Sequence, residues 1–297
     1  MQDRSLLLRG YLAAAATLVM WTGFSLFSRY AGKSVLTPYD VFALRLSVAA
    51  LVLLPFAPRF LGQGAWRDQR LWLLASLGSL LYCLVVYTGF RYAPAAHGAI
   101  LLSGMQPFLI SAIVLAVDGI LPNRMRSLGL IGIATGIACA AVPYFNVWSP
   151  EVVFGDLLIF SGSVLWAIYS VLAKRWGYSP WTLTSAVALI PAVLYLPIYA
   201  LFLPKALAEA PLALIVTQGL YQGIVATILA MLAYLKAISI LGTERAAVFL
   251  ALVPITTGLT AVPLLGEALT GWLLSGLVFV SLGSFVASRY GGSVSRN

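Results

Sequence analysis

Ionisable side chains are almost absent from the long apolar stretches of this chain, and this limits the chemistry open to it. Only 9% of the 297 residues are charged, and His97 is the one histidine. A membrane enzyme would need a nucleophile with a neighbouring base, or a metal cluster, and the sequence supplies neither. Cys83 and Cys139 lie in apolar runs, where we interpret them as small buried residues. We therefore expect no catalytic residue, no metal and no cofactor.

Uncharged polar side chains could bind a solute instead. Gln218, Tyr221 and Gln222 follow one another at i, i+3 and i+4, which puts two amides and a phenol on one helical face. Such a face should not meet lipid, so it either hydrogen-bonds a substrate or joins neighbouring helices. Gln106, close to Ser103 on another predicted helix, presents a similar choice.

Aromatic residues well inside apolar runs are further candidates, because membrane Trp and Tyr usually collect at the interfaces. Trp166, Tyr169 and Tyr82 would offer flat surfaces to an apolar or aromatic group, and close helix packing is the alternative. The full set of predicted substrate-binding residues is Trp21, Tyr82, Ser103, Gln106, Trp166, Tyr169, Gln218, Tyr221, Gln222 and Tyr234.

Charged groups near the middle of the membrane are not expected to serve a substrate. The first apolar run has no carboxylate between Asp3 and Asp40, and Arg45 in the second run is left without a role. Because a charged solute would need a counter-charge in a low-dielectric site, this favours a neutral or zwitterionic solute.

Three titratable residues lie near the ends of apolar runs. Asp156 follows Gly155, and we interpret it as a helix N-cap. We interpret His97 as a solvated interfacial side chain, with proton-linked gating as the alternative. Glu244 is expected to pair with nearby basic residues, Lys236 or Arg245.

The elements that must position these side chains are membrane helices. With 61% hydrophobic residues and a mean hydropathy of +0.97, the chain cannot be a water-soluble fold. Its basic residues are scattered, so nucleic acid is not an expected partner, and the lipid bilayer is. Apolar runs of about 20 residues predict ten spans: 10–30, 40–58, 71–91, 95–117, 127–146, 155–175, 180–203, 213–236, 244–265 and 270–289.

The distribution of basic residues predicts the orientation of these spans. If the N-terminus is cytoplasmic, thirteen Lys and Arg residues fall on that side, and only Arg29, Lys33, Arg91 and Lys205 fall on the other. Because basic residues concentrate in cytoplasmic loops, we expect both termini in the cytoplasm of a bacterium and a multi-pass protein in its inner membrane.

An internal repeat appears when the second half is shifted by 147 residues onto the first. Tyr87 then meets Tyr234 and Pro107 meets Pro254, and at a shift of 145 Trp21 meets Trp166. Because each predicted half, 1–148 and 149–297, holds an odd number of spans, the two copies must be inverted. Inverted repeats place a substrate site between the halves near the midplane.

Together with this repeat, the segment Gly155-Asp156-Leu157-Leu158 and the ending Leu264-Leu265-Gly266-Glu267 resemble the drug/metabolite transporter superfamily, within it the ten-helix exporters with two EamA-type repeats. The chain looks most like the YddG-type exporters of aromatic and other neutral amino acids. The resemblance implies an all-α fold and export of such amino acids or close metabolites from the cytoplasm by alternating access. An exporter of drugs or other metabolites and a non-transporting membrane protein are the alternatives.

Two features bear on movement and assembly. Pro107 and Pro254 are predicted to interrupt their helices and act as hinges, where freed backbone groups could meet a zwitterion without any buried carboxylate. This pattern favours facilitated diffusion. Gly132 and Gly136 form a face of small residues, which could pack within the chain or between two chains, so a monomer and a weak homodimer both remain open.

Overall fold

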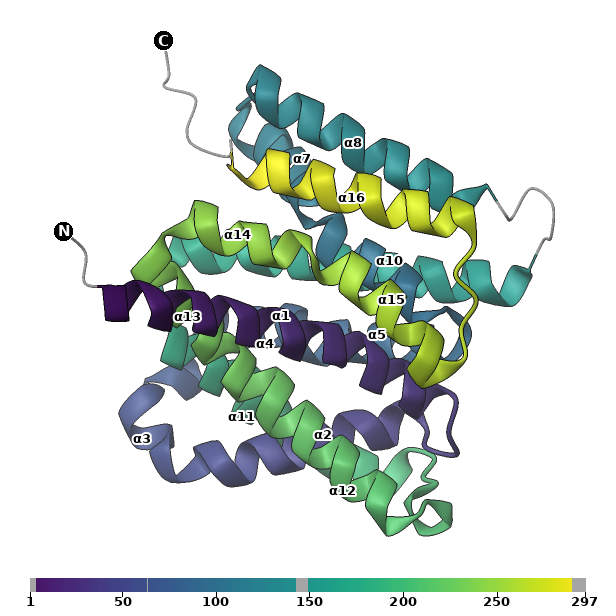
Figure 1. Ribbon diagram of the computed structural model, residues 1–297. Coiled ribbons are helices and arrows are strands. Elements are labelled where there is room, and N and C mark those ends of the chain that lie inside the picture. Colours follow the sequence, from purple (N-terminus) through teal and green to yellow (C-terminus); the bar gives the residue numbers. More distant parts are fainter. Residues whose placement is uncertain (1–3, 63, 143–148, 290–297) are drawn as a thin grey trace.

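The computed structural model describes residues 4–62, 64–142 and 149–289, apart from the side chains of residues 243, 244 and 247 (Figure 1). Within these ranges all regular structure is helical, as the sequence predicted. The principal helices are α1 (Arg4–Gly32), α2 (Pro38–Leu53), α4 (Gln69–Ala75), α5 (Tyr82–Tyr92), α6 (Ala95–Ala99), α7 (Gln106–Asp118), α8 (Arg124–Ala141), α10 (Pro150–Trp176), α11 (Pro180–Phe202), α12 (Leu212–Leu220), α13 (Ala230–Leu241), α14 (Thr243–Ala251), α15 (Val253–Leu265) and α16 (Gly271–Arg289).

In the described part of the chain, eight continuous helical stretches are long and apolar enough to cross a membrane, and α15 is a shorter apolar helix. The fifth predicted span corresponds to α8, and its expected end at residue 146 lies outside the described residues. The ninth predicted span is divided into α14 and α15, which join at Leu252. The chain is therefore a multi-pass membrane protein.

Three of the stretches contain π-helical segments: Ser76–Leu81 between α4 and α5, Ile100–Gly104 between α6 and α7, and Tyr221–Leu229 between α12 and α13. The first and third occupy equivalent places in the two halves at the shift of 147 residues. The break at Met105 before Pro107 is likewise equivalent to the break at Leu252 before Pro254. The structure thus places a helix interruption at both prolines.

Local capping explains how α2 enters the bundle. Thr37 and Asp40 form a reciprocal capping box, and Pro38 takes the first helical position, where its missing N–H costs nothing. The buried carboxylate of Asp40 also accepts hydrogen bonds from Tyr199 Oη (2.5 Å) and from the backbone N–H of Ala206 (3.1 Å). This cap therefore fixes α2 to the end of α11 and the loop after it.

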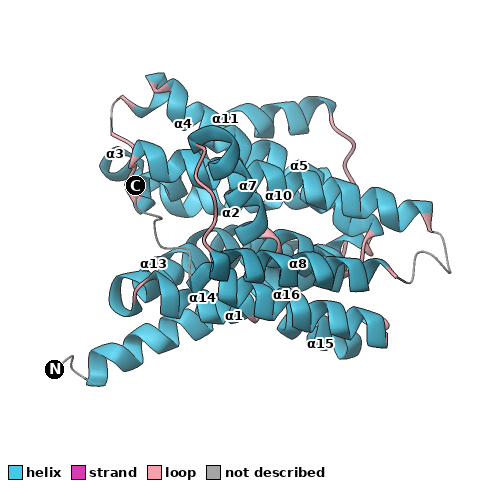
Figure 2. Ribbon diagram, turned by 90° about the horizontal axis from the view of Figure 1, so that it is seen from above, coloured by secondary structure: helices cyan, strands magenta, loops and turns pink. Residues whose placement is uncertain are grey.

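The two halves exchange packing partners. Helix α1 packs against α13 and α15 of the second half, while α10 packs against α5 and α7 of the first. Figure 2 shows the resulting layers, with α4, α5, α10 and α11 on one side and α1, α13, α15 and α16 on the other. Because each layer contains helices from both halves, helices of both halves border the space between the layers.

Helices α8 and α16 lie side by side at one edge of the bundle (Figure 1). A Cβ added at Gly136 would lie 2.6 Å from the backbone N of Val280, and one at Gly283 would lie 2.5 Å from that of Ile133. Gly132 likewise faces Gly283. The face of small residues on α8 therefore packs within the chain, against α16. This is the first of the two possibilities that the sequence left open for that face.

Replacing Gly283 by Ala should destabilise the protein, because the new methyl group would press on the backbone of α8 at Ile133 and Gly129. Overpacking of this kind costs about 1–3 kcal/mol. Gly271→Ala is the matched control on the same helix, since nothing lies within 4 Å of its Cβ position. Thermal unfolding of both purified variants in detergent measures the effect, and equal midpoints would contradict this account of the α8–α16 contact.

Candidate functional site

A cavity of about 390 Å³ lies between the two layers. Its wall includes residues from both halves of the chain, drawn from α1, α2, α5, α10 and α13 among others. Seven of the ten residues predicted from the sequence line it: Trp21, Tyr82, Ser103, Gln106, Trp166, Tyr169 and Tyr234. The cavity therefore collects side chains that are far apart in the sequence.

Two aromatic groups face the cavity, one from each layer. In one layer the ring centroid of Trp166 lies 5.2 Å from that of Tyr82 and 5.0 Å from that of Tyr169. In the other layer Trp21 lies 5.2 Å from Tyr234. Tilted rings at these separations attract one another, so each group is held in place without a ligand and presents a fixed apolar surface.

Two of the polar side chains in the wall, those of Gln106 and Ser103, come from the interrupted fourth span. Gln106, the first residue of α7, donates from Nε2 to the carbonyl of Ser163 at 3.2 Å. Its Oε1 is buried and accepts no hydrogen bond from the described residues. Ser103 lies in the π-helical segment just before the break and also lines the cavity. The wall is thus apolar with a few placed hydrogen-bonding groups.

The remaining three predicted residues lie elsewhere, in the contact between α1 and the stretch formed by α12 and the π-helical segment after it. Gln218 donates to the carbonyl of Phe27 at 3.0 Å, and Tyr221 donates to that of Met20 at 3.0 Å. Gln222 donates to Ser28 Oγ at 3.2 Å. These side chains join helices, which is the alternative that the sequence had left open for this face.

Arg45 is a cavity residue that the sequence analysis did not anticipate. It projects from α2 into the wall, with 8% of its surface exposed, and donates from Nη1 to Tyr87 Oη at 3.1 Å. No carboxylate lies within ion-pairing distance among the described residues. The expectation that no counter-charge faces a substrate was therefore wrong. A cation far inside an apolar helix was itself a signal of function.

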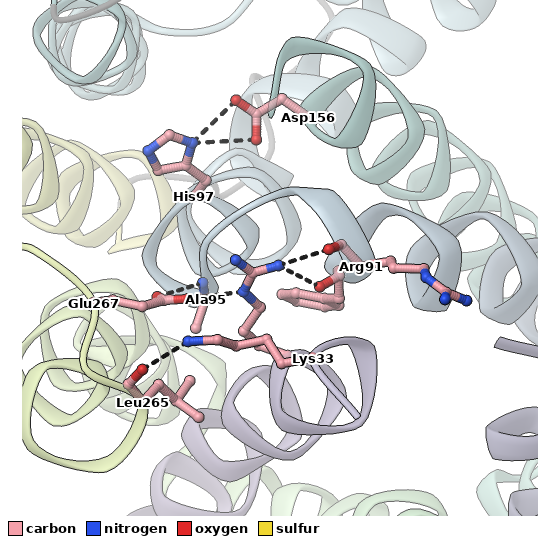
Figure 3. Close-up of polar contacts among 9 residues, drawn as sticks. Lys33, Arg91, Ala95, His97, Asp156, Leu265 and Glu267 are labelled. Atoms are coloured by element: carbon pink, nitrogen blue, oxygen red, sulfur yellow. Dashed lines mark hydrogen bonds and ion pairs between the residues drawn. The ribbon is translucent and has the colours of Figure 1, made fainter. Parts of the chain in front are cut away.

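One end of the bundle is tied by an ion pair from α1 to Glu267, just after α15 (Figure 3). Arg29 Nε lies 2.8 Å from Glu267 Oε1, and Arg29 Nη1 donates to the carbonyls of Phe90 and Arg91 at 2.9 Å. The second oxygen of Glu267 accepts from the backbone N–H of Ala95 at 2.8 Å. We name this side of the molecule the Glu267 end. Its contacts join α1, α5, α6 and α15.

The opposite side, here named the Asp118 end, has a related but more exposed ion pair. Arg175 Nη2 lies 2.6 Å from Asp118 Oδ1, and the two side chains are 45% and 36% exposed. Tyr178 at the same end donates to Asp68 Oδ2 at 2.5 Å. This hydrogen bond holds the pKa of Asp68 below its ordinary value, while burial and the same bond raise the pKa of Tyr178 to about 12.

The cavity extends toward the Asp118 end. Its wall reaches Ala173, three residues before Trp176 at the end of α10. In the other direction it stops at Ser25 and Arg45, each seven residues from the helix terminus at the Glu267 end. At about 3.6 residues a turn, roughly two helical turns lie beyond the wall at the Glu267 end of α1 and α2, whereas one turn or less remains at the Asp118 end of α10. On α7 and α13 about two turns remain beyond Ile110 and Tyr234.

Asp156 and His97 depart from their predicted roles. Helix α10 begins at Pro150 after Ser149, so Asp156 lies inside the helix and the prediction of an N-cap was wrong. Its carboxylate instead lies 3.0 Å from His97 Nδ1, in the pair drawn in Figure 3. His97 is 14% exposed and therefore not simply solvated. The predicted partner contacts of Glu244 involve a side chain outside the described set.

Comparison of the sequence with known protein families gives a match to each half of the chain. The model of the EamA-like transporter family matches this chain twice, over residues 8–142 and 153–289. The chain belongs to the EamA-like transporter family. Its two matched ranges together span most of the sequence and correspond to the two sets of helices that exchange partners in the bundle.

Two proteins with similar sequences are described as transporters. An uncharacterized transporter, YyaM, of Bacillus subtilis is 25% identical, over 72% of this chain and 71% of the relative. An uncharacterized transporter of Archaeoglobus fulgidus is 24% identical, over 86% of this chain and 89% of the relative. A protein of known crystal structure has the same fold, with a TM-score of 0.64 at 20% identity over 96% of this chain and 97% of the other.

The position of the cavity in this EamA-family protein can be tested with a thiol probe. Ser103→Cys, in a Cys139→Ala background, should react with a small hydrophilic thiol reagent because Ser103 lines the cavity. The native Cys83 is fully buried and should stay unreactive. Ser281→Cys is the control, since Ser281 is 3% exposed and does not line the cavity. Equal labelling of both engineered thiols, measured by mass spectrometry, would argue against the cavity.

Proposed function

We propose that this EamA-family transporter exports neutral amino acids, aromatic ones among them, from the bacterial cytoplasm across the inner membrane, without converting them chemically. The observation that carries this proposal is the cavity between the layers, which combines opposed aromatic groups with amide and hydroxyl side chains. Ligand pockets for small molecules are usually 300–1,000 Å³, and the 390 Å³ here suits one small solute.

The wall matches both parts of such a solute. The rings of Trp166, Tyr82 and Trp21 can contact an apolar or aromatic side chain with little loss of rotamer freedom. Gln106 and Ser103 can hydrogen-bond the polar part, since the buried Oε1 of Gln106 accepts no hydrogen bond from the described residues. An amino acid has this combination of an apolar body and a compact polar group.

The direction of export follows from the orientation that the basic residues favour. Most Lys and Arg residues, among them Arg9, Arg124 and Arg175, belong to the Asp118 end, which we place in the cytoplasm. Both termini are then cytoplasmic. The cavity faces the cytoplasm in this arrangement, ready to accept a solute, and the Glu267 end forms the outer closure.

The two ion pairs support alternating access. Arg29–Glu267 joins α1 to the end of α15, and Arg175–Asp118 joins α10 to the end of α7, which are the exchanged elements of the two halves. The first pair also bonds to the turn between α5 and α6. In the described part of the chain the second pair has no such bond to the turn between α13 and α14. Closing the cytoplasmic side would bring the Arg175–Asp118 pair into contact with the turn between α13 and α14. Pro107 and Pro254 would act as the hinges of this movement.

One observation favours a second candidate. Apolar side chains such as Leu102, Ile110 and Met231 make up much of the cavity wall, which also suits hydrophobic drugs or other metabolites. Competition between labelled amino acids and hydrophobic dyes distinguishes the two candidates. In an amino-acid exporter, only other amino acids should inhibit the flux of the labelled amino acid. In a drug exporter, many apolar compounds should inhibit the transport of the dye.

Liposomes containing the purified protein should release labelled Trp, Phe, Met or Thr, with or without an imposed pH gradient. Trp166→Ala should reduce that flux at least tenfold, because it removes one of the two indole rings of the cavity wall, the one in contact with Tyr82 and Tyr169. Trp272→Ala is the matched control, since Trp272 is 54% exposed on α16 and does not line the cavity. Absence of amino-acid flux in the unmodified protein would overturn the proposal.

Glu267→Gln should loosen the outer closure, because it leaves the guanidinium of Arg29 without its carboxylate partner at a site where both side chains are less than 15% exposed. In the Ser103→Cys background, thiol labelling from the outer face of oriented vesicles should rise several-fold. Glu209→Gln is the control, since Glu209 is an exposed carboxylate in the connection after α11 and takes no part in this ion pair. Unchanged outer-face labelling in Glu267→Gln would contradict a gating role for this pair.

A further inference from the structure

Arg45 is a permanent positive charge in the cavity wall, and no carboxylate of the described residues lies within ion-pairing distance of it. Its guanidinium has five N–H donors in a rigid planar fork, and only one of them has a hydrogen-bond acceptor among the described residues, Tyr87 Oη. The ring centroid of Phe24 lies 5.8 Å away on another side of the same group. The remaining donors are available to a molecule in the cavity that Arg45 lines.

A chain of hydrogen bonds fixes the direction of this guanidinium. Tyr87 Oη donates its own proton to Gln222 Oε1 at 3.1 Å, and Gln222 Nε2 donates to Ser28 Oγ at 3.2 Å. Because Tyr87 must donate to Gln222, its oxygen is left as an acceptor for Arg45. The network thus links α1, α2, α5 and the π-helical segment after α12, and it holds Arg45 by one edge.

We propose that Arg45 anchors an anionic group of the transported solute, so that the transporter selects molecules with a carboxylate at one end and an apolar group at the other. This inference rests on the proposed function and narrows its substrate class. Planar bidentate pairing is the geometry in which a guanidinium recognises a carboxylate best, and it is strengthened where water is excluded. Tyr82 and Trp166 in the same wall would contact the apolar group.

A purely structural role would leave a different signature. One hydrogen bond to Tyr87 does not require a charge, and a neutral donor would bridge α2 and α5 without the penalty of a buried cation. If Arg45 served only that bond, the protein would not distinguish an acid from its amide. Discrimination between these two ligands therefore separates an anchor from a packing residue.

The first arm of the test uses the unmodified protein in detergent, where membrane permeability of the ligands does not interfere. Binding of labelled phenylalanine is competed with phenylalaninamide, which lacks the anion, and with 3-phenylpropionate, which lacks the amine. Phenylalaninamide should compete about tenfold to a hundredfold more weakly than phenylalanine, as expected for a lost charge-assisted hydrogen bond. Equal competition by the acid and the amide would overturn the anchor while leaving amino-acid transport intact.

The second arm changes the protein. Arg45→Met should reduce affinity for phenylalanine by at least tenfold and abolish the preference over phenylalaninamide, whereas Arg45→Lys should retain part of that preference because it keeps the charge. Arg59→Met is the matched control, at an exposed position outside the cavity. Affinity for phenylalaninamide in Arg45→Met reports whether the cavity is still formed. A retained preference for the acid in that variant would contradict the proposal.

Failure of the proposed function can be recognised separately. If the unmodified protein binds and transports no amino acid, that function is wrong, and labelled 3-phenylpropionate then tests the anchor directly. Binding of this acid that is lost in Arg45→Met would support the anchor in a carrier of other carboxylates. Absence of binding by any carboxylate would overturn it.

Discussion

In the hydrocarbon of a membrane every backbone N–H and C=O must find a partner within the protein, and this constraint governs the whole bundle. Where the α-helical pattern is interrupted, side chains of neighbouring elements supply the partners. Ser163 donates to the carbonyl of Leu101 at 2.5 Å, and Ser284 donates to that of Gly104 at 2.6 Å. Both carbonyls belong to the π-helical segment before α7. The irregular backbone is thus confined to the interior, beside the cavity.

The same constraint explains why the two halves need each other. The first half alone could not satisfy its interrupted fourth span, since the hydroxyls that bond the segment Ile100–Gly104 come from α10 and α16 of the second half. The α8–α16 pair, packed backbone against backbone through glycines, is a contact that leaves little space for sliding. The alternating access that we propose would therefore place movement between the layers at the breaks before Pro107 and Pro254.

The sequence predicted the helices well because length and apolarity decide whether a segment spans a membrane, and both are visible in single runs of residues. It predicted the equivalent breaks because the repeat aligns Pro107 with Pro254. The side of a helix that faces the cavity was harder to infer. A polar face such as that of Gln218 and Gln222 indicates that this side of the helix avoids lipid. Both a cavity wall and a contact between helices satisfy that condition, so the sequence could not distinguish them.

Two errors have distinct physical origins. Asp156 was interpreted from its glycine neighbour as a cap, but a cap can be recognised only where the helix start is known, and α10 begins six residues earlier. Arg45 was set aside because its neighbours along the chain are apolar. Its partner Tyr87 is 42 residues away, and the network continues to Gln222, a further 135 residues along. Contacts of that range have no signature in local spacing.

The buried charge has a consequence for the transport cycle. A cation at the centre of a membrane helix is unfavourable by roughly 2.5–3.5 kcal/mol on insertion scales, and more where water is excluded. An empty cavity that closes on both sides would leave Arg45 beside Tyr87 and Phe24, with no carboxylate of the described residues within ion-pairing distance. In the proposed cycle, a carboxylate bound to Arg45 would remove most of that penalty, so the loaded protein would pass through the closed state more easily than the empty one. The proposed anchor would in this way couple recognition of the solute to the rate at which the two layers exchange access.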